Sequence, residues 1–222
     1  MKINQNQVII NVIQYDYIFL MLLNFINRYR LPLASYIGLL VLITTLRFFI
    51  NPGLVLSISA TYMLMAGFVL GHNDNLLALN KKGFIKGLLF TVIILLIYIS
   101  CFKLFSIFTG KELGIREFTY SFILVQFLLV ALPEEVFFRG YLQNEFGNDI
   151  SAIIIASFLF ASAHLITICA SGTVGVNTCV QNGLTFFPSL VMGYLYLRTR
   201  TLWSSILFHF FANIVHILMI IH

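Results

Sequence analysis

The sequence predicts an all-α, polytopic membrane protein built as a bundle of seven or eight transmembrane helices. Of its 222 residues, 60% are hydrophobic and only 9% are charged, and the mean hydropathy is +0.97. An ordinary soluble domain carries roughly a quarter charged residues, because its surface faces water. A chain with so few charges is expected to face lipid, so the composition excludes a soluble globular domain.

The expected helices follow from the polar breaks in the sequence. A bilayer core of about 30 Å needs about 20 apolar helical residues. Cutting at the polar breaks leaves eight segments, which we assign to a single membrane domain over residues 1–222. They are Val8–Ile26, Leu31–Ile50, Pro52–Gly71, Phe84–Phe108, Phe118–Phe146, Ile150–Ile168, Leu184–Leu197 and Leu202–Ile221. Asn11, Gln14 and Asp16 interrupt the first, which is therefore also compatible with a helix in the membrane interface.

The basic residues predict an orientation in the membrane. If all eight segments cross, one side collects Arg28, Arg30, Lys81, Lys82, Arg198 and Arg200, and the other holds Lys2, Lys111 and Arg116 beside Glu112 and Glu117. The first side is expected to be cytoplasmic by the positive-inside rule. We therefore expect a multi-pass protein of a bacterial cytoplasmic membrane, with the uncharged stretch Cys169–Asn182 outside. The bilayer is an expected partner, whereas nucleic acid is not, because the net charge of +5 is not gathered into a basic stripe.

The three cysteines, Cys101, Cys169 and Cys179, match no C-x-x-C spacing, which excludes a zinc ribbon or a thioredoxin-like site. The ten-residue separation of Cys169 and Cys179 is compatible with a disulfide if their loop faces an oxidising compartment. Two unpaired thiols are the alternative.

Two adjacent carboxylates, Glu134 and Glu135, lie inside an otherwise apolar segment. Each costs on the order of 3 kcal/mol at mid-span, so both must face protein or water. Glu135 and Arg139 stand at i and i+4, the favourable orientation for an ion pair. Glu134 lies about 100° around the helix and shares its stripe with Phe138. The spacing therefore predicts a neutralised Glu135 and a reactive Glu134, with a purely structural ion cluster as the alternative.

Two further helices carry polar groups at a similar depth. His164 lies in a segment of small residues that allow close helix packing (Ala152, Ala156, Ser157, Ala161, Ser162 and Ala163), and His209 and Asn213 lie at i and i+4 in the last segment. Counted from one side, Glu134, His164, His209 and Asn213 lie about 10 to 20 Å deep. A shared depth predicts one cavity, although each histidine alone is compatible with a structural hydrogen bond. For His216, one turn further on, we expect such an inter-helix bond.

Glu-Glu-x-x-x-Arg, Phe160-x-x-x-His164 and His209-x-x-x-Asn213, in this order and spacing, resemble the motifs of the CAAX-protease and bacteriocin-processing family of intramembrane endopeptidases, also called Abi proteins. The resemblance covers about Phe118 to Asn213 and implies a catalytic core over residues 118–213. It implies that Glu134 and His164 activate water and that His209 and Asn213 stabilise the oxyanion. It also leaves zinc possible, with Glu134, His164 and His209 as ligands. We favour a metal-free site without a cofactor, because the Asn213 amide suits oxyanion donation and Glu135 is paired with Arg139.

The resemblance thus predicts a protease that hydrolyses a peptide bond in a protein or peptide with a membrane-associated or C-terminal tail. Two alternatives remain: a non-catalytic immunity or binding protein on the same scaffold, and a proton-coupled transporter with Glu134 and His164 as a relay. No motif residue has decayed, which argues against the first. The second is disfavoured because the chain shows no paired halves with interrupted helices.

Overall fold

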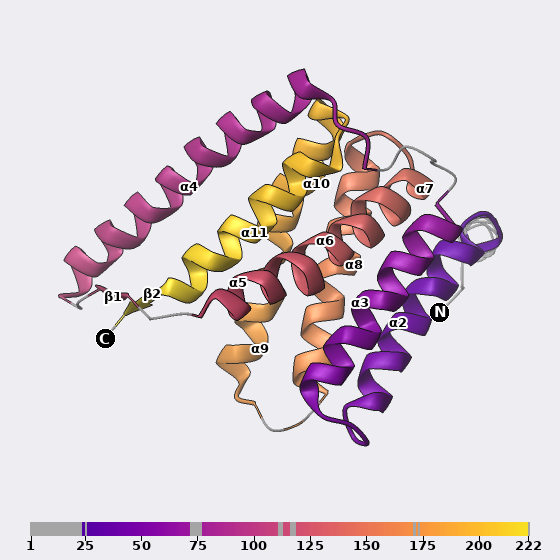
Figure 1. The fold of residues 1–222 in the computed structure, drawn as a ribbon. Helices are drawn as coiled ribbons and strands as arrows, with labels where there is room; N and C mark the ends of the chain where they lie inside the picture. Colours follow the sequence, from indigo (N-terminus) through magenta and orange to yellow (C-terminus); the bar gives the residue numbers. More distant parts are fainter. Residues whose placement is uncertain are drawn as a thin grey trace, which may run out of the picture.

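In the computed structural model, the chain forms a bundle of antiparallel helices, which confirms the predicted fold class (Figure 1). The structure describes residues 24, 26–71, 77–110, 113–115, 119–170, 172 and 174–221. Most of the predicted segment Val8–Ile26 lies outside these residues. The helices are α2 (Arg30–Leu46), α3 (Pro52–Val69), α4 (Lys81–Thr109), α8 (Ile150–Cys169), α9 (Val176–Gly183), α10 (Phe186–Thr199), α11 (Leu202–Leu218) and a composite helix over Tyr120–Phe146.

The composite helix carries both carboxylates and contains two π-helical stretches. It consists of α5 (Tyr120–Val125), the π-helix η1 (Gln126–Ala131), α6 (Leu132–Glu135), the π-helix η2 (Val136–Gln143) and α7 (Asn144–Phe146). Its α-helical middle is thus one turn long, with π-helical winding on both sides. π-Helical turns are rare and are found frequently at functional sites.

Side-chain caps set several helix starts. The side chains of Asn51, Asn80, Thr119 and Asp149 each accept a hydrogen bond from the backbone N–H three residues later, at the starts of α3, α4, α5 and α8. These bonds satisfy N–H groups that have no partner within the helix. At Asp149 the bond from Ala152 also lowers the pKa of the carboxyl group.

Within the described residues, four helices are long and apolar enough to cross a membrane: α3, α4, the composite helix and α8. α2 and α11 are apolar but shorter. Two predicted boundaries are wrong. The expected loop Cys169–Asn182 contains α9, so the segment predicted over Leu184–Leu197 is the 14-residue α10. The last predicted segment ends early, because β2 (Met219–Ile221) leaves the helix and pairs antiparallel with β1 (Leu113–Ile115).

Close helix contacts fix the bundle. α4 packs along α11, where a Cβ atom at Gly83 or Gly87 would overlap the Thr199 carbonyl or the Ser204 side chain. α8 packs against α10, η2 and α2, in keeping with the close helix packing that its small residues allow. The largest core cluster includes the buried aromatic side chains Tyr36, Phe137, Phe138, Tyr141, Phe146 and Phe160. This core surrounds the helix that carries the two carboxylates.

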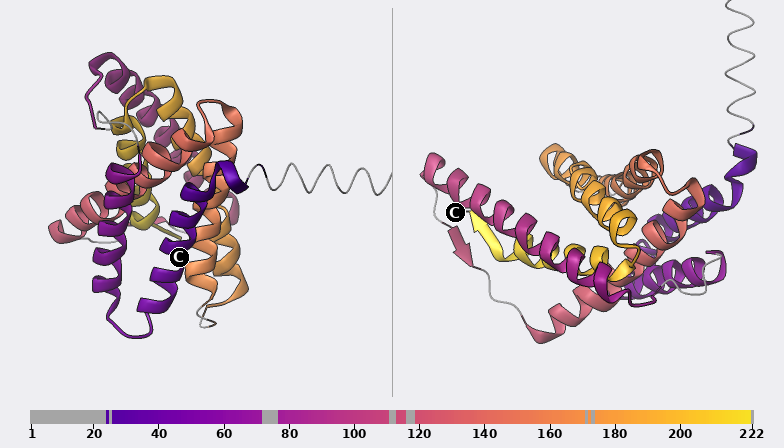
Figure 2. Two further views of the ribbon diagram at one scale, coloured as in Figure 1. Left: turned by 90° about the vertical axis from the view of Figure 1, so that its right-hand side faces the viewer. Right: turned by 90° about the horizontal axis from the view of Figure 1, so that it is seen from above.

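The bundle has two distinguishable ends (Figures 1 and 2). At one end lie the turn between α2 and α3 and the connection from α8 to α9. The structure pairs Cys169 with Cys179 there, which the sequence left open against two unpaired thiols, and we refer to this end as the disulfide end. At the other end, α10 turns into α11 beside the start of α4.

Candidate active site

The Glu135–Arg139 pair predicted from the i, i+4 spacing is confirmed. Arg139 Nη1 donates to Glu135 Oε1 at 2.9 Å, and the two side chains are 1% and 0% exposed. Arg139 Nη2 donates to the backbone carbonyl and the hydroxyl of Ser189 on α10, at 3.1 and 2.7 Å. The guanidinium also lies over the Phe160 ring, 4.8 Å from its centroid. Arg139 therefore joins the composite helix to α8 and α10.

His209 lies between the two carboxylates. Its Nδ1 is 2.9 Å from Glu135 Oε1, and its Nε2 is 3.7 Å from Glu134 Oε2. An ionised carboxylate only accepts hydrogen bonds, so Nδ1 carries the proton of the bond to Glu135. Nε2 is thereby directed at Glu134. The spacing alone did not predict that Glu135 binds both Arg139 and His209.

His164 approaches Glu134 from α8. Its Nδ1 donates to the Phe160 carbonyl oxygen at 3.0 Å, because a carbonyl oxygen can only accept. Its Nε2 lies 4.0 Å from Glu134 Oε2. Phe160 also stacks on His164 and packs edge-on against His209, with centroids 4.4 and 5.7 Å apart. The first motif residue of α8 thus holds both histidine rings.

Glu134 Oε2 is buried and makes no hydrogen bond with any described residue, although the Nε2 atoms of His164 and His209 both face it. Separations of 3.7 and 4.0 Å are too long for direct hydrogen bonds, and a water molecule can bridge such groups. Three of the four predicted catalytic side chains therefore converge, as the shared depth predicted.

The fourth, Asn213, lies on α11 one turn beyond His209 and is held by a different partner. Its Nδ2 donates to Gln126 Oε1 on η1 at 3.3 Å. The sequence analysis did not single out Gln126. Its signal was available, since it is an uncharged polar residue two turns before Glu134 in an apolar segment. His216 is hydrogen-bonded to Tyr98 on α4 at 3.0 Å, which matches its expected inter-helix role.

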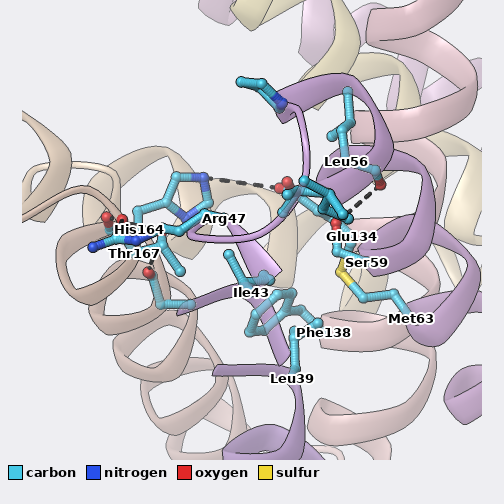
Figure 3. A pocket seen from close by; sticks show the side chains of 14 residues that line it. Leu39, Ile43, Arg47, Leu56, Ser59, Met63, Glu134, Phe138, His164 and Thr167 are labelled. Carbon is cyan, nitrogen blue, oxygen red and sulfur yellow. Dashed lines mark hydrogen bonds and ion pairs between the residues drawn. The ribbon is translucent and has the colours of Figure 1, made fainter. Parts of the chain in front are cut away.

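Glu134 and His164 line a cavity of about 290 Å³ between α2, α3 and α8 (Figure 3). Its walls are mostly apolar, with Leu39 and Ile43 from α2 and Met63 from α3 among them. Arg47, which the sequence analysis did not single out, also lines this cavity. Arg47 could have been predicted from its spacing, because it lies four residues after Ile43 and eight after Leu39, on the same helix face.

The zinc alternative concerns Glu134, His164 and His209. Their types suit zinc, and the Nδ1 atom of each histidine has a carbonyl or carboxylate partner, as zinc-binding histidines usually do. Within the described part of the chain, however, no group of three His, Cys, Asp or Glu side chains is arranged to hold a metal ion.

Residues 116–215 match the family model described as type II CAAX prenyl endopeptidase, Rce1-like. A UPF0177 protein, YaiH, of Lactococcus lactis subsp. lactis is 31% identical over 169 residues, which covers 71% of this chain and 66% of that protein. The chain thus spans slightly less than two thirds of this curated relative. No solved structure matches.

Proposed function

Because this chain belongs, through residues 116–215, to the Rce1-like family of CAAX endopeptidases, we propose that it hydrolyses a peptide bond in a membrane-associated or C-terminal-tail substrate with water activated by Glu134 and His164. The chain is an integral membrane protein. The observation that carries the proposal is the unpartnered Glu134 Oε2 beside an apolar cavity, with two histidine Nε2 atoms facing it.

The tautomer of His164 determines how water would be held. With its proton on Nδ1, bound to the Phe160 carbonyl, Nε2 offers a lone pair towards Glu134. A water molecule between them can donate one hydrogen to Glu134 and the other to His164. Its oxygen lone pair is then directed away from both acceptors, towards a peptide carbonyl in the cavity. Glu134 takes the proton as the water oxygen bonds to the carbonyl carbon.

His209 and Asn213 would stabilise the oxyanion that forms. Glu134 and Glu135 carry two negative charges and Arg139 one positive charge, so a protonated His209 makes the cluster neutral. In that state its Nε2–H is a donor on the Glu134 side. The Asn213 amide has a second N–H besides the one directed at Gln126. When the tetrahedral intermediate collapses, Glu134 returns its proton to the departing amine, and the carboxyl product and the amine are released.

The test compares Glu134→Gln and His164→Ala with the parent protein in membranes of the host. Loss of the general base is expected to lower turnover by about 10² to 10⁴. The readout is a shifted terminus of a membrane protein, detected by mass spectrometry of terminal peptides. Glu145→Gln is the matched control, since it removes a carboxylate from the same composite helix outside the cavity. The assignment is wrong if both site variants process the same termini at the parental rate.

A further inference from the structure

The cavity beside Glu134 extends to the disulfide end of the bundle. Leu39, Ile43 and Arg47 follow one face of α2 from mid-helix to the turn, a rise of about 12 Å. Ile50 of that turn and Pro52, the first residue of α3, also line the cavity. On α8, His164 lies five residues before Cys169, about 8 Å from the helix end. The cavity therefore connects the reactive carboxylate with the α2–α3 turn.

Two independent observations place the disulfide end outside the cytoplasm. Disulfides persist in oxidising compartments, and Cys169–Cys179 lies at this end. Of the 13 Lys and Arg residues, seven lie at or within two turns of the opposite end: Arg28, Arg30, Lys81, Lys82, Lys86, Arg198 and Arg200. Arg47 belongs to the disulfide end, and Lys103 lies in the part of α4 that leads away from the opposite end. The positive-inside rule makes the end with seven cytoplasmic.

Arg47 is the cationic side chain of the cavity wall and lies at its outer part. The other titratable groups that line the cavity are Glu134 and His164. Its Nη1 donates to the Thr167 carbonyl near the end of α8, and its guanidinium stacks over Phe48. Its guanidinium makes no other hydrogen bond to the described residues. A guanidinium has five N–H donors in a planar fork that matches a carboxylate. Donors thus remain for a ligand in the cavity.

We propose that the substrate segment enters this cavity from the disulfide end, outside the cytoplasm, and that Arg47 binds a carboxylate of the entering segment. That the bound segment is then cleaved rests on the proposed function. Entry of the segment and binding of its carboxylate can be measured without cleavage. The carboxylate is either the C-terminus of the segment or an acidic side chain. The apolar walls accommodate the flanking side chains.

Entry is tested by thiol labelling in intact cells. All variants carry Cys101→Ser, which removes the free thiol. The test variant is Leu56→Cys, which lines the cavity. The controls are Leu54→Cys, on the same helix but not part of the cavity lining, and Asn148→Cys, at the opposite end. A membrane-impermeant methanethiosulfonate is expected to modify Leu56→Cys from outside and to reach Asn148→Cys only after permeabilisation. Labelling of Leu56→Cys only after permeabilisation would overturn the entry side, whether or not the protein cleaves anything.

The charge of Arg47 is tested with the same cysteine. Anionic and cationic methanethiosulfonates are compared on Leu56→Cys, and their rate ratio is normalised to that of a surface cysteine. Arg47→Gln is expected to lower the anionic-to-cationic ratio roughly tenfold, and Arg47→Lys to retain it. Arg47→Lys also controls for the loss of the bond to Thr167. A ratio that Arg47→Gln leaves unchanged would refute anion binding here.

The source of the carboxylate is tested by protection of Leu56→Cys in the Glu134→Gln variant, which is expected to bind without cleaving. The probes are acetyl-trileucine, its C-terminal amide, and acetyl-Leu-Asp-Leu amide. Protection by the free acid but not by trileucine amide assigns the C-terminus, and protection by the Asp peptide assigns a side chain. Arg47→Gln is expected to abolish the difference in protection between the probes that carry a carboxylate and trileucine amide. Equal protection by all three probes would contradict carboxylate recognition.

Discussion

Removing the Glu135 carboxylate tests the buried ion pair at the centre of the site. In Glu135→Ala, Arg139 keeps its two bonds to Ser189 and its contact with Phe160 but loses its counter-charge at 1% exposure. Breaking a buried pair by removing one partner costs about 3 to 5 kcal/mol. For a chain of this size, that loss corresponds to a melting temperature lower by roughly 6 to 20 °C. His209 loses its acceptor in the same variant.

The assay is thermal unfolding of the detergent-solubilised protein, followed by the fluorescence of Trp203, the single tryptophan of the chain. The control is the double variant Glu135→Leu with Arg139→Met, which removes both charges and keeps the volume. Replacing a buried pair by apolar residues is often neutral or stabilising, so the double variant should recover most of the loss. The reasoning is refuted if Glu135→Ala melts within about 2 °C of the parent protein, or if the double variant melts no higher than the single one.

Three further predictions concern the oxyanion, metal and packing. Asn213→Ala should lower turnover by roughly 10² to 10³, the cost of one oxyanion donor, in a peptide-release assay. Purified active protein should carry substoichiometric zinc by elemental analysis and keep its activity after dialysis against a chelator, because Glu134 and His164 supply the base. Gly87→Ala should destabilise the bundle by about 1 to 3 kcal/mol, since its methyl group would overlap Ser204, and the melting temperature should fall accordingly.

Each of these three predictions has a control variant or a result that would contradict it. An unaltered rate in Asn213→Ala would remove this residue from the site. Near-stoichiometric zinc that is lost together with activity on chelation, and restores activity when returned, would establish the metal mechanism. For the packing prediction the control is Gly53→Ala, where an added Cβ atom meets only Asn51 Oδ1 at an ordinary 3.4 Å. Equal stability of the two alanine variants would contradict the close contact of α4 with α11.

The local part of the site was predictable from the sequence because it depends on spacing along one helix. Glu135 and Arg139 are neighbours on any helix that contains them at i and i+4. The approach of His209 to Glu135 depends instead on how α11 packs against the composite helix, which spacing does not contain. The hydrogen bond from Asn213 to Gln126 was missed for the same reason.

The fold was predictable where hydrophobic runs end at strong breaks. α3 begins at Pro52 and α8 at Ile150, where the sequence analysis placed them, because Asn51 and Asp149 cap both helices. The helix prediction failed between Cys169 and Leu184, because the short polar helix α9 contains no apolar run that would indicate it. Arg47 was not among the predicted site residues, because only the packing of α2 against α8 places it on the cavity wall.

The π-helical stretch η1 makes the site sensitive to the length of the chain. α11 meets the composite helix on both sides of η1, through Asn213 with Gln126 at its start and His209 with Glu135 just beyond it. Deleting one residue within η1 would turn the helix on one side relative to the other by about 100°. The two contacts could then no longer form together. A single-codon deletion here would therefore break one of the two contacts between α11 and the composite helix while leaving Glu134, His164, His209 and Asn213 in the sequence.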